Sequence, residues 1–180
     1  TSNLYNDYNI KFLMASFINR KSFCFGILLL LSSLSHANSN HSIFTITFSI
    51  MSYVKWSNPN PSLCVIDDND TQNELALIAS AKKPNLKVVN VPLSNLKNIK
   101  CDAIFFSQNT ANEEQNIINN LKSPPALSFS TNNADCEIGS VFCLYTSKSG
   151  KSLFKVNLDS LAKTKIHIDP RVLLLAQQTE

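Results

Sequence analysis

Runs of apolar residues separated by polar, helix-patterned stretches predict short strands that alternate with helices. Four strands are predicted from runs bounded by polar or turn residues: Leu63–Ile66, Leu86–Val91, Asp102–Phe106 and Ala126–Phe129. A helix over Thr71–Lys82 is predicted after the first strand, with Thr71 and Glu74 at capping-box spacing. Another is predicted over Ala111–Lys122, where two prolines end the pattern. This half of the chain therefore favours strand–helix–strand units and a parallel sheet.

The carboxyl-terminal half has a different pattern. Val141–Tyr145 and Leu153–Val156 flank the polar stretch Ser147–Lys151 and predict an antiparallel hairpin. Three short pieces follow, namely a helix over Leu158–Lys163, an extended piece over Ile166–Ile168 and a helix over Arg171–Ala176. The predicted fold class is α/β: a single-domain sandwich with a mixed sheet flanked by helices, a carboxyl-terminal hairpin and short helices.

The stretch Ser39–Trp56 fits two patterns. Ile43, Ile46, Ile50 and Tyr53 fit one face of a helix, but Ile-Phe-Thr-Ile-Thr-Phe also alternates like a strand. Periodicity alone leaves both conformations open.

The amino-terminal part is typical of a secretory signal. Arg20 and Lys21 precede the apolar run Phe23–Leu31, and Ser35-His36-Ala37 supplies small residues at cleavage-site spacing. The apolar run is about half of the ~20 residues that a membrane-spanning helix needs. The pattern therefore predicts export and cleavage after Ala37.

This interpretation divides the chain into three parts. Residues 1–13, before the first methionine, are interpreted as upstream sequence outside the translated protein, and residues 14–37 as the signal peptide. Residues 38–180 are expected to form one α/β domain, since their number suits one domain and is small for two.

Composition excludes several classes of function. Residues 38–180 contain 13 Lys plus Arg and 12 Asp plus Glu without a basic stripe, so no nucleic-acid partner is predicted. Gly139 and Gly150 are the only glycines in this part. A phosphate-binding P-loop and a dinucleotide fingerprint both need closely spaced glycines, so neither motif is present and no cofactor is predicted.

Four cysteines follow the signal segment: Cys64, Cys101, Cys136 and Cys143. An even number in an exported chain of this size predicts two disulfides, although counting leaves three pairings open. Cys136 and Cys143 flank a short turn-like stretch and are natural partners. The spacing does not suit a zinc site, so no metal is predicted. A catalytic Cys–His167 pair is disfavoured in an oxidising compartment, and no catalytic residue is assigned.

Asp67 and Asp68 follow the first predicted strand, where phospho-receiver domains place an acidic pocket. That pocket also needs an Asp at the end of the third strand, where this chain has Ser107 and Gln108. A calcium loop over Asp67–Ile78 also fails, because its sixth and twelfth residues are Gln and Ile. Asp67 and Asp68 are therefore predicted to form a solvated loop and a helix start.

Several segments together resemble the YfiR family, in order and spacing. They are Ile50–Trp56, Leu63-Cys64-Val65, Cys101-Asp102, Cys136–Leu144, Phe154–Asp159 and Ile168–Ala176. The resemblance spans about residues 45–176. It implies a dimeric periplasmic α/β protein with disulfides Cys64–Cys101 and Cys136–Cys143. It also implies a partner, the periplasmic sensor domain of an inner-membrane diguanylate cyclase of the YfiN type. Family members hold that cyclase inactive, which lowers cyclic di-GMP and biofilm formation.

A non-enzymatic regulator of this kind needs an interface. The candidate interface residues are Trp56, Leu158, Ile168, Leu173 and Leu174. Tyr53 is interpreted mainly as a core residue, and at least one of three consecutive leucines on a short helix must point away from its own core. The alternative is a small periplasmic solute-binding domain whose ligand lies at the carboxyl edge of the sheet. A wide apolar pocket with converging polar groups favours the alternative, and an exposed apolar patch near the carboxyl terminus favours the regulator.

Overall fold

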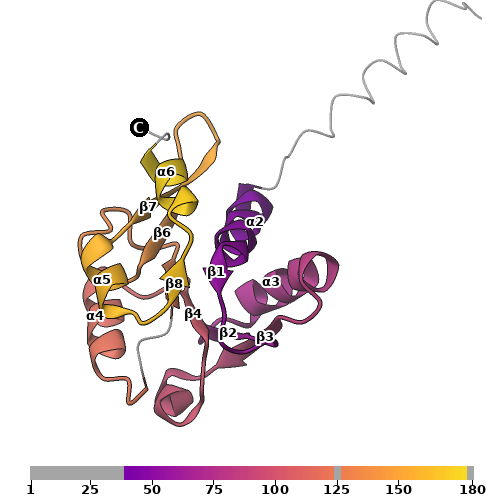
Figure 1. Ribbon diagram of the computed structural model, residues 1–180, viewed down its shortest axis with the longest axis vertical. Helices are drawn as coiled ribbons and strands as arrows, with labels where there is room; N and C mark the ends of the chain where they lie inside the picture. The colour runs from indigo at the N-terminus through magenta and orange to yellow at the C-terminus, as the bar shows by residue number, and fades with distance from the viewer. Residues whose placement is uncertain (1–38, 124–126, 178–180) are drawn as a thin grey trace, which may run out of the picture. The chain divides into compact units, whose positions relative to one another are not determined.

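The central element of the computed structural model is a six-stranded sheet in the order β3-β2-β4-β5-β6-β7 (Figure 1). The structure describes residues 39–123 and 127–177, so the predicted signal peptide, its cleavage site and residues 1–13 lie outside the described residues. The strands are β2 (Ser62–Ile66), β3 (Lys87–Val91), β4 (Ala103–Phe106), β5 (Leu127–Ser130), β6 (Phe142–Thr146) and β7 (Ser152–Val156). The first five are parallel, and β7 pairs antiparallel with β6.

The predicted α/β class, the parallel first half and the hairpin are confirmed. Counted from β2, the parallel strands have the order 2-1-3-4-5 of doubly wound folds. The helices are α2 (Ser39–Ser52), α3 (Asn69–Lys82), α4 (Ala111–Asn119), α5 (Leu158–Lys163) and α6 (Arg171–Gln177). The 3₁₀-helix η1 (Leu93–Asn98) was not predicted. None of the helices described is long and apolar enough to cross a bilayer.

The ambiguous segment is a helix followed by a very short strand. Helix α2 packs on the sheet through Phe44 and Phe48, and the chain then enters β1 (Val54–Lys55). Strand β1 pairs antiparallel with β8 (His167–Ile168), outside the main sheet. The segment forms a helix despite its alternating pattern because burial of the aromatic face against the sheet stabilises the helix more.

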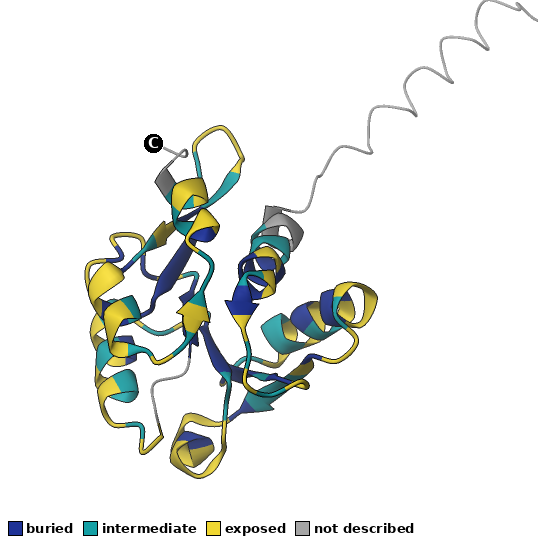
Figure 2. Ribbon diagram, viewed as in Figure 1, coloured by how far each residue is buried: buried dark blue, intermediate teal, exposed yellow. Residues whose placement is uncertain are grey.

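A row of phenylalanines crosses one face of the sheet. Phe105, Phe129 and Phe142 lie at paired positions of β4, β5 and β6, and their ring centroids are 6.4 and 5.4 Å apart. Phe44 of α2 and Phe154 of β7 make edge contacts at the two ends of the row. The row ties α2 to the antiparallel edge of the sheet, and Figure 2 shows the buried strands between the helices.

Two helix boundaries differ by two or more residues from the sequence-based prediction. Helix α3 begins at Asn69 and not at Thr71, since Asp68 is its N-cap and accepts hydrogen bonds from Thr71 N (2.9 Å) and Thr71 Oγ1 (2.8 Å). The predicted capping box of Thr71 with Glu74 is therefore wrong. Helix α4 ends at Asn119, three residues before the predicted end, and a capping box of Thr110 with Glu113 begins it.

Both disulfides have the pairing that the family resemblance implied. Cys64 of β2 is joined to Cys101 just before β4, with Cα atoms 5.8 Å apart. Cys136 is joined to Cys143 of β6, with Cα atoms 5.7 Å apart. The first bond ties two neighbouring strands to each other, and the second closes the loop that leads into the hairpin.

Candidate partner-binding surface

Helix α6 lies on strand β7, and Val172 fixes it there, since this side chain is 0% exposed. Successive residues of an α-helix point about 100° apart. Leu174 therefore points away from Val172 and is 57% exposed, while Leu173 and Leu175 point to the two sides. The expectation that at least one leucine of the three faces outward is correct: Leu174 is the most exposed, and Leu175 is 44% exposed.

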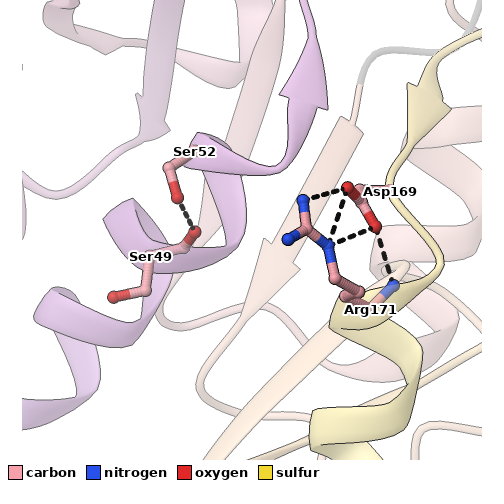
Figure 3. A network of polar contacts seen from close by, with 4 residues as sticks. All are labelled: Ser49, Ser52, Asp169 and Arg171. Atoms are coloured by element: carbon pink, nitrogen blue, oxygen red, sulfur yellow. Dashed lines mark hydrogen bonds and ion pairs between the residues drawn. The ribbon is translucent and has the colours of Figure 1, made fainter.

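Strands β1 and β8 form a separate two-stranded sheet, which we call the β1–β8 ribbon. An ion pair and this ribbon lie at the start of α6. Figure 3 shows Asp169 and Arg171 facing each other, with Nη2 of Arg171 2.6 Å from Oδ2 of Asp169. Near them, Ser52 Oγ donates to the Ser49 carbonyl within α2. The backbone N–H of Asp169 donates to the Tyr53 carbonyl, and the guanidinium carbon of Arg171 lies 5.6 Å from the centroid of the Tyr53 ring.

This ion pair changes the acid–base behaviour of both residues. Hydrogen bonds from the Arg171 side chain lower the pKa of Asp169 to about 2, and the same contacts raise the pKa of Arg171. Both residues therefore remain charged at neutral pH and orient the first turn of α6.

Two cavities lie on opposite sides of α6. The smaller has a volume of about 340 Å³. Its lining is Val172 and Leu175 of α6, Leu153 and Phe154 of β7, Ile46, Ser49 and Ile50 of α2, and Tyr53. The larger has a volume of about 690 Å³. Its lining is Leu173 and Ala176 of α6, Leu158 of α5, Lys155 and Val156 of β7, and Asp135 and Cys136.

The structure brings together some of the predicted interface residues. Leu158 and Leu173 line the same cavity, and Leu174 lies beside them on the outer side of α6. Leu158 is 62% exposed although it is a large apolar residue. We call the surface formed by Leu158, Leu173, Leu174 and Leu175 with the two cavities the α6 surface.

Ile168 and Trp56 are placed elsewhere. Ile168 is partly buried in β8, where it pairs with Val54. Trp56 lines a separate cavity of about 250 Å³ beside Pro61 and Leu86, and its indole N–H donates to the Met51 carbonyl at 3.1 Å. Their part in an interface stays a prediction. Leu175, Leu153 and Lys155 were not predicted, because which side chains line the cavities depends on how α6 packs on β7.

The loop closed by Cys136–Cys143 forms one wall of the larger cavity. A buried carboxylate, Glu114 of α4, holds this loop: Oε2 accepts hydrogen bonds from Ser140 N (3.0 Å) and Asn133 Nδ2 (3.1 Å). Gly139, in the same loop, has φ +87° and lies against Glu114. Glu114 thereby fixes the conformation of this wall.

The carboxyl edge of the sheet is occupied by internal hydrogen bonds. Asp68 accepts from Thr71, from Ser107 Oγ (2.6 Å) and from Gln108 Nε2 (3.5 Å), and its N–H donates to Asn90. Partial burial raises the pKa of Asp68, but the hydrogen bonds from Ser107, Thr71 and Gln108 outweigh burial and leave the pKa below its ordinary value. Asp68 starts a helix, as predicted, and Asp67 is exposed in the adjoining turn.

Among the residues that the structure describes, no group of three or more His, Cys, Asp or Glu is arranged to hold a metal ion. His167 lies in the β1–β8 ribbon, and both thiols with which it might have paired are in a disulfide.

The YfiR/HmsC-like family matches residues 44–177, from helix α2 through helix α6. The match covers more than half of the chain and includes every residue of the α6 surface.

Proposed function

Because this chain belongs to the YfiR/HmsC-like family, we propose that it is a periplasmic regulatory protein that restrains an inner-membrane diguanylate cyclase. It binds the periplasmic sensor domain of the cyclase, lowers cyclic di-GMP and so limits biofilm formation. It works by binding and not by catalysis, and it works as a homodimer.

The observation that carries this proposal is the α6 surface. Large apolar side chains that remain exposed beside cavities are typical of protein-binding sites. Leu158 and Leu174 are both more than half exposed, and the family match extends through them.

The disulfides support an oxidising compartment. Two disulfides in a domain of this size are usual in exported proteins and rare in the cytosol. Together with the signal-like sequence around Phe23–Leu31, they favour export to the periplasm.

Restraint by binding is a shift of populations. The regulator must bind the inactive conformation of the sensor domain more tightly than the active one, since equal affinity would leave the equilibrium unchanged. A surface held in one position suits this task, and the pairing of β1 with β8 and the buried Val172 anchor α6 to the rest of the domain.

One observation gives weight to the solute-binding alternative. The larger cavity, at about 690 Å³, falls within the range of small-molecule sites, and Lys155 and Asp135 place charge at its lining. The carboxyl edge, where that alternative places its ligand, is instead filled by the hydrogen bonds of Asp68.

The deciding experiment measures cyclic di-GMP in four strains: wild type, a strain lacking this protein, a strain lacking the partner cyclase and a strain lacking both. Loss of this protein should raise cyclic di-GMP only when the cyclase is present. A deletion that leaves the nucleotide unchanged, or raises it equally without the cyclase, would overturn the proposal and favour solute binding.

A matched pair of variants connects that phenotype to the surface. Leu174→Glu should behave like the deletion, since it places a charge on the outer side of α6. Leu77→Glu should behave like wild type, because Leu77 is 72% exposed on α3, outside the α6 surface.

A further inference from the structure

The two cavities and helix α6 define a binding surface of a particular shape. Leu173 faces the larger cavity and Leu175 the smaller, with the exposed Leu174 between them. Both volumes exceed about 300 Å³, the lower end of sites that hold small molecules, so each can accept an apolar side chain of a partner. A single segment that crosses α6 can therefore place one side chain in each cavity.

The elements that form or adjoin this surface carry more positive than negative charge. Residues 141–177 contain six Lys plus Arg against two Asp, whereas residues 43–140 contain seven Lys plus Arg against nine Asp plus Glu. The basic residues are Lys148, Lys151, Lys155, Lys163, Lys165 and Arg171. All belong to the hairpin, α5 and its connection to β8, or α6, the elements that form or adjoin the cavities.

Little of this charge is neutralised internally. In the part of the chain that the structure describes, the ion pair is Arg171 with Asp169, which leaves the five lysines without a carboxylate in contact. Lys155 lines the larger cavity, donates to the Ala134 carbonyl (2.9 Å) and lies 5.8 Å from the Tyr145 ring centroid. Against these five lysines stand Asp135, Glu137 and Asp159, so the unpaired charges of these elements sum to +2.

From these features we infer that the segment docking on the α6 surface is acidic and amphipathic. Two apolar side chains of the partner enter the cavities on either side of α6, and carboxylates beside them face the lysines. This inference rests on the proposed function, because it describes the part of the sensor domain that is bound. Opposite charges across an interface steer association and exclude wrong partners.

Two other occupants fit the surface less well. A second copy that docked through the same face would bring the lysines of one protomer against those of the other, because a two-fold interface pairs a patch with itself. An anionic membrane would match the charge, but its surface does not supply side chains that fill two separate cavities.

The first test measures binding of the purified sensor domain of the partner cyclase to the folded, disulfide-bonded protein. Raising the salt concentration from about 0.1 M to about 1 M shortens the Debye length from about 10 Å to about 3 Å. Binding should weaken at least about fivefold over this range if rim charges contribute. Lys155→Glu should weaken binding by a similar factor, and Leu175→Glu should weaken it more, since it places a carboxylate in the apolar lining of the smaller cavity.

Matched controls lie on α3. Lys82→Glu makes the same charge reversal as Lys155→Glu, and Leu77→Glu the same apolar-to-charged change as Leu175→Glu. Both controls should bind like wild type. Circular dichroism and thermal melting verify that each variant remains folded. Binding that does not depend on salt and tolerates Lys155→Glu and Leu175→Glu would overturn the inference and leave the regulatory proposal standing.

The second test does not depend on the cyclase. A short synthetic helix-forming peptide of Leu and Glu is compared with its counterpart of Leu and Lys and with vesicles of anionic lipid, with NMR shifts of Leu153 and Leu173 as the measurement. Shifts with the acidic peptide alone support the inference. If the acidic peptide binds but the sensor domain does not, the regulatory proposal is wrong and the description of the surface holds. Binding to the basic peptide, or to vesicles in preference to the acidic peptide, would refute it.

Discussion

The loop that forms a wall of the larger cavity depends on a close approach at Gly139, and this can be tested by substitution to alanine. Gly139 has φ +87°, a region that an L-residue adopts at a cost of about 1–2 kcal/mol. A Cβ atom there would also lie 2.7 Å from Oε2 of Glu114 and 2.9 Å from the carbonyl oxygen of Ala111. The second contact is with backbone in the first turn of α4, so it is not relieved by rotating a side chain.

Relief of these contacts would move Glu114 away from the loop. Oε2 of Glu114 accepts hydrogen bonds from Ser140 N and Asn133 Nδ2. Loss of each hydrogen bond costs about 1 kcal/mol or more, because a buried donor is left without its acceptor. When the backbone cost is added to the loss of these two hydrogen bonds, Gly139→Ala should lower the free energy of unfolding by about 3–4 kcal/mol.

Gly150→Ala is the matched control. Gly150 has φ +79°, but a Cβ atom there would meet nothing within 4 Å. It should cost only the backbone contribution of about 1–2 kcal/mol. The assay is urea unfolding of both variants and wild type, with disulfides intact and equal slopes required for comparison. If Gly139→Ala is as stable as Gly150→Ala within about 0.5 kcal/mol, an uncertainty typical of comparing variants, the close approach does not support the loop.

Two further predictions concern the disulfides and α6. Removing the Cys64–Cys101 bond, with a sequence separation of 37, should cost about 4 kcal/mol, and removing Cys136–Cys143, with a separation of 7, about 2.5 kcal/mol in the chain-entropy model. Urea unfolding of the two Cys→Ser double variants measures this, and the reverse order would contradict it. The pKa of Asp169 is lowered to about 2 in the folded state, so the stabilisation it gives to α6 is present above its ordinary pKa of 3.8 and is lost as pH falls through about 2. An NMR titration should place the midpoint of the Asp169 carboxyl near pH 2 in the wild type and nearer the ordinary value in Arg171→Ala. An equal midpoint in both proteins would show that the ion pair does not cause the lowered pKa.

The sequence determined the features that depend on local pattern. The hairpin over β6 and β7, the bounds of α5 and the parallel strands followed from apolar runs and turn residues, because a strand or short helix with one buried face needs that pattern whatever surrounds it. The four cysteines predicted two disulfides through their number and context, and the pairing came from the family resemblance.

Other features depended on residues far apart in the chain. The choice of helix for Ser39–Ser52 followed from packing of Phe44 and Phe48 on the sheet. The helix start at Asp68 was predicted, but its hydrogen bonds from Ser107 and Gln108, about 40 residues away in the sequence, were not. Local pattern carries no information on such partners.

The α6 surface shows the same division most clearly. Three consecutive leucines indicated that at least one of them faces outward, but that Leu174 is the most exposed depended on Val172 being the residue buried against β7. The two cavities exist only because α6, α5, β7 and the segment before the ribbon meet at one edge of the sheet. The sequence alone could name Leu158, Leu173 and Leu174 as candidates. The tertiary structure decided that Leu158 and Leu173 line one cavity and that Ile168 and Trp56 lie outside it. Such cavities arise from packing between distant elements, and the order of residues does not reveal them.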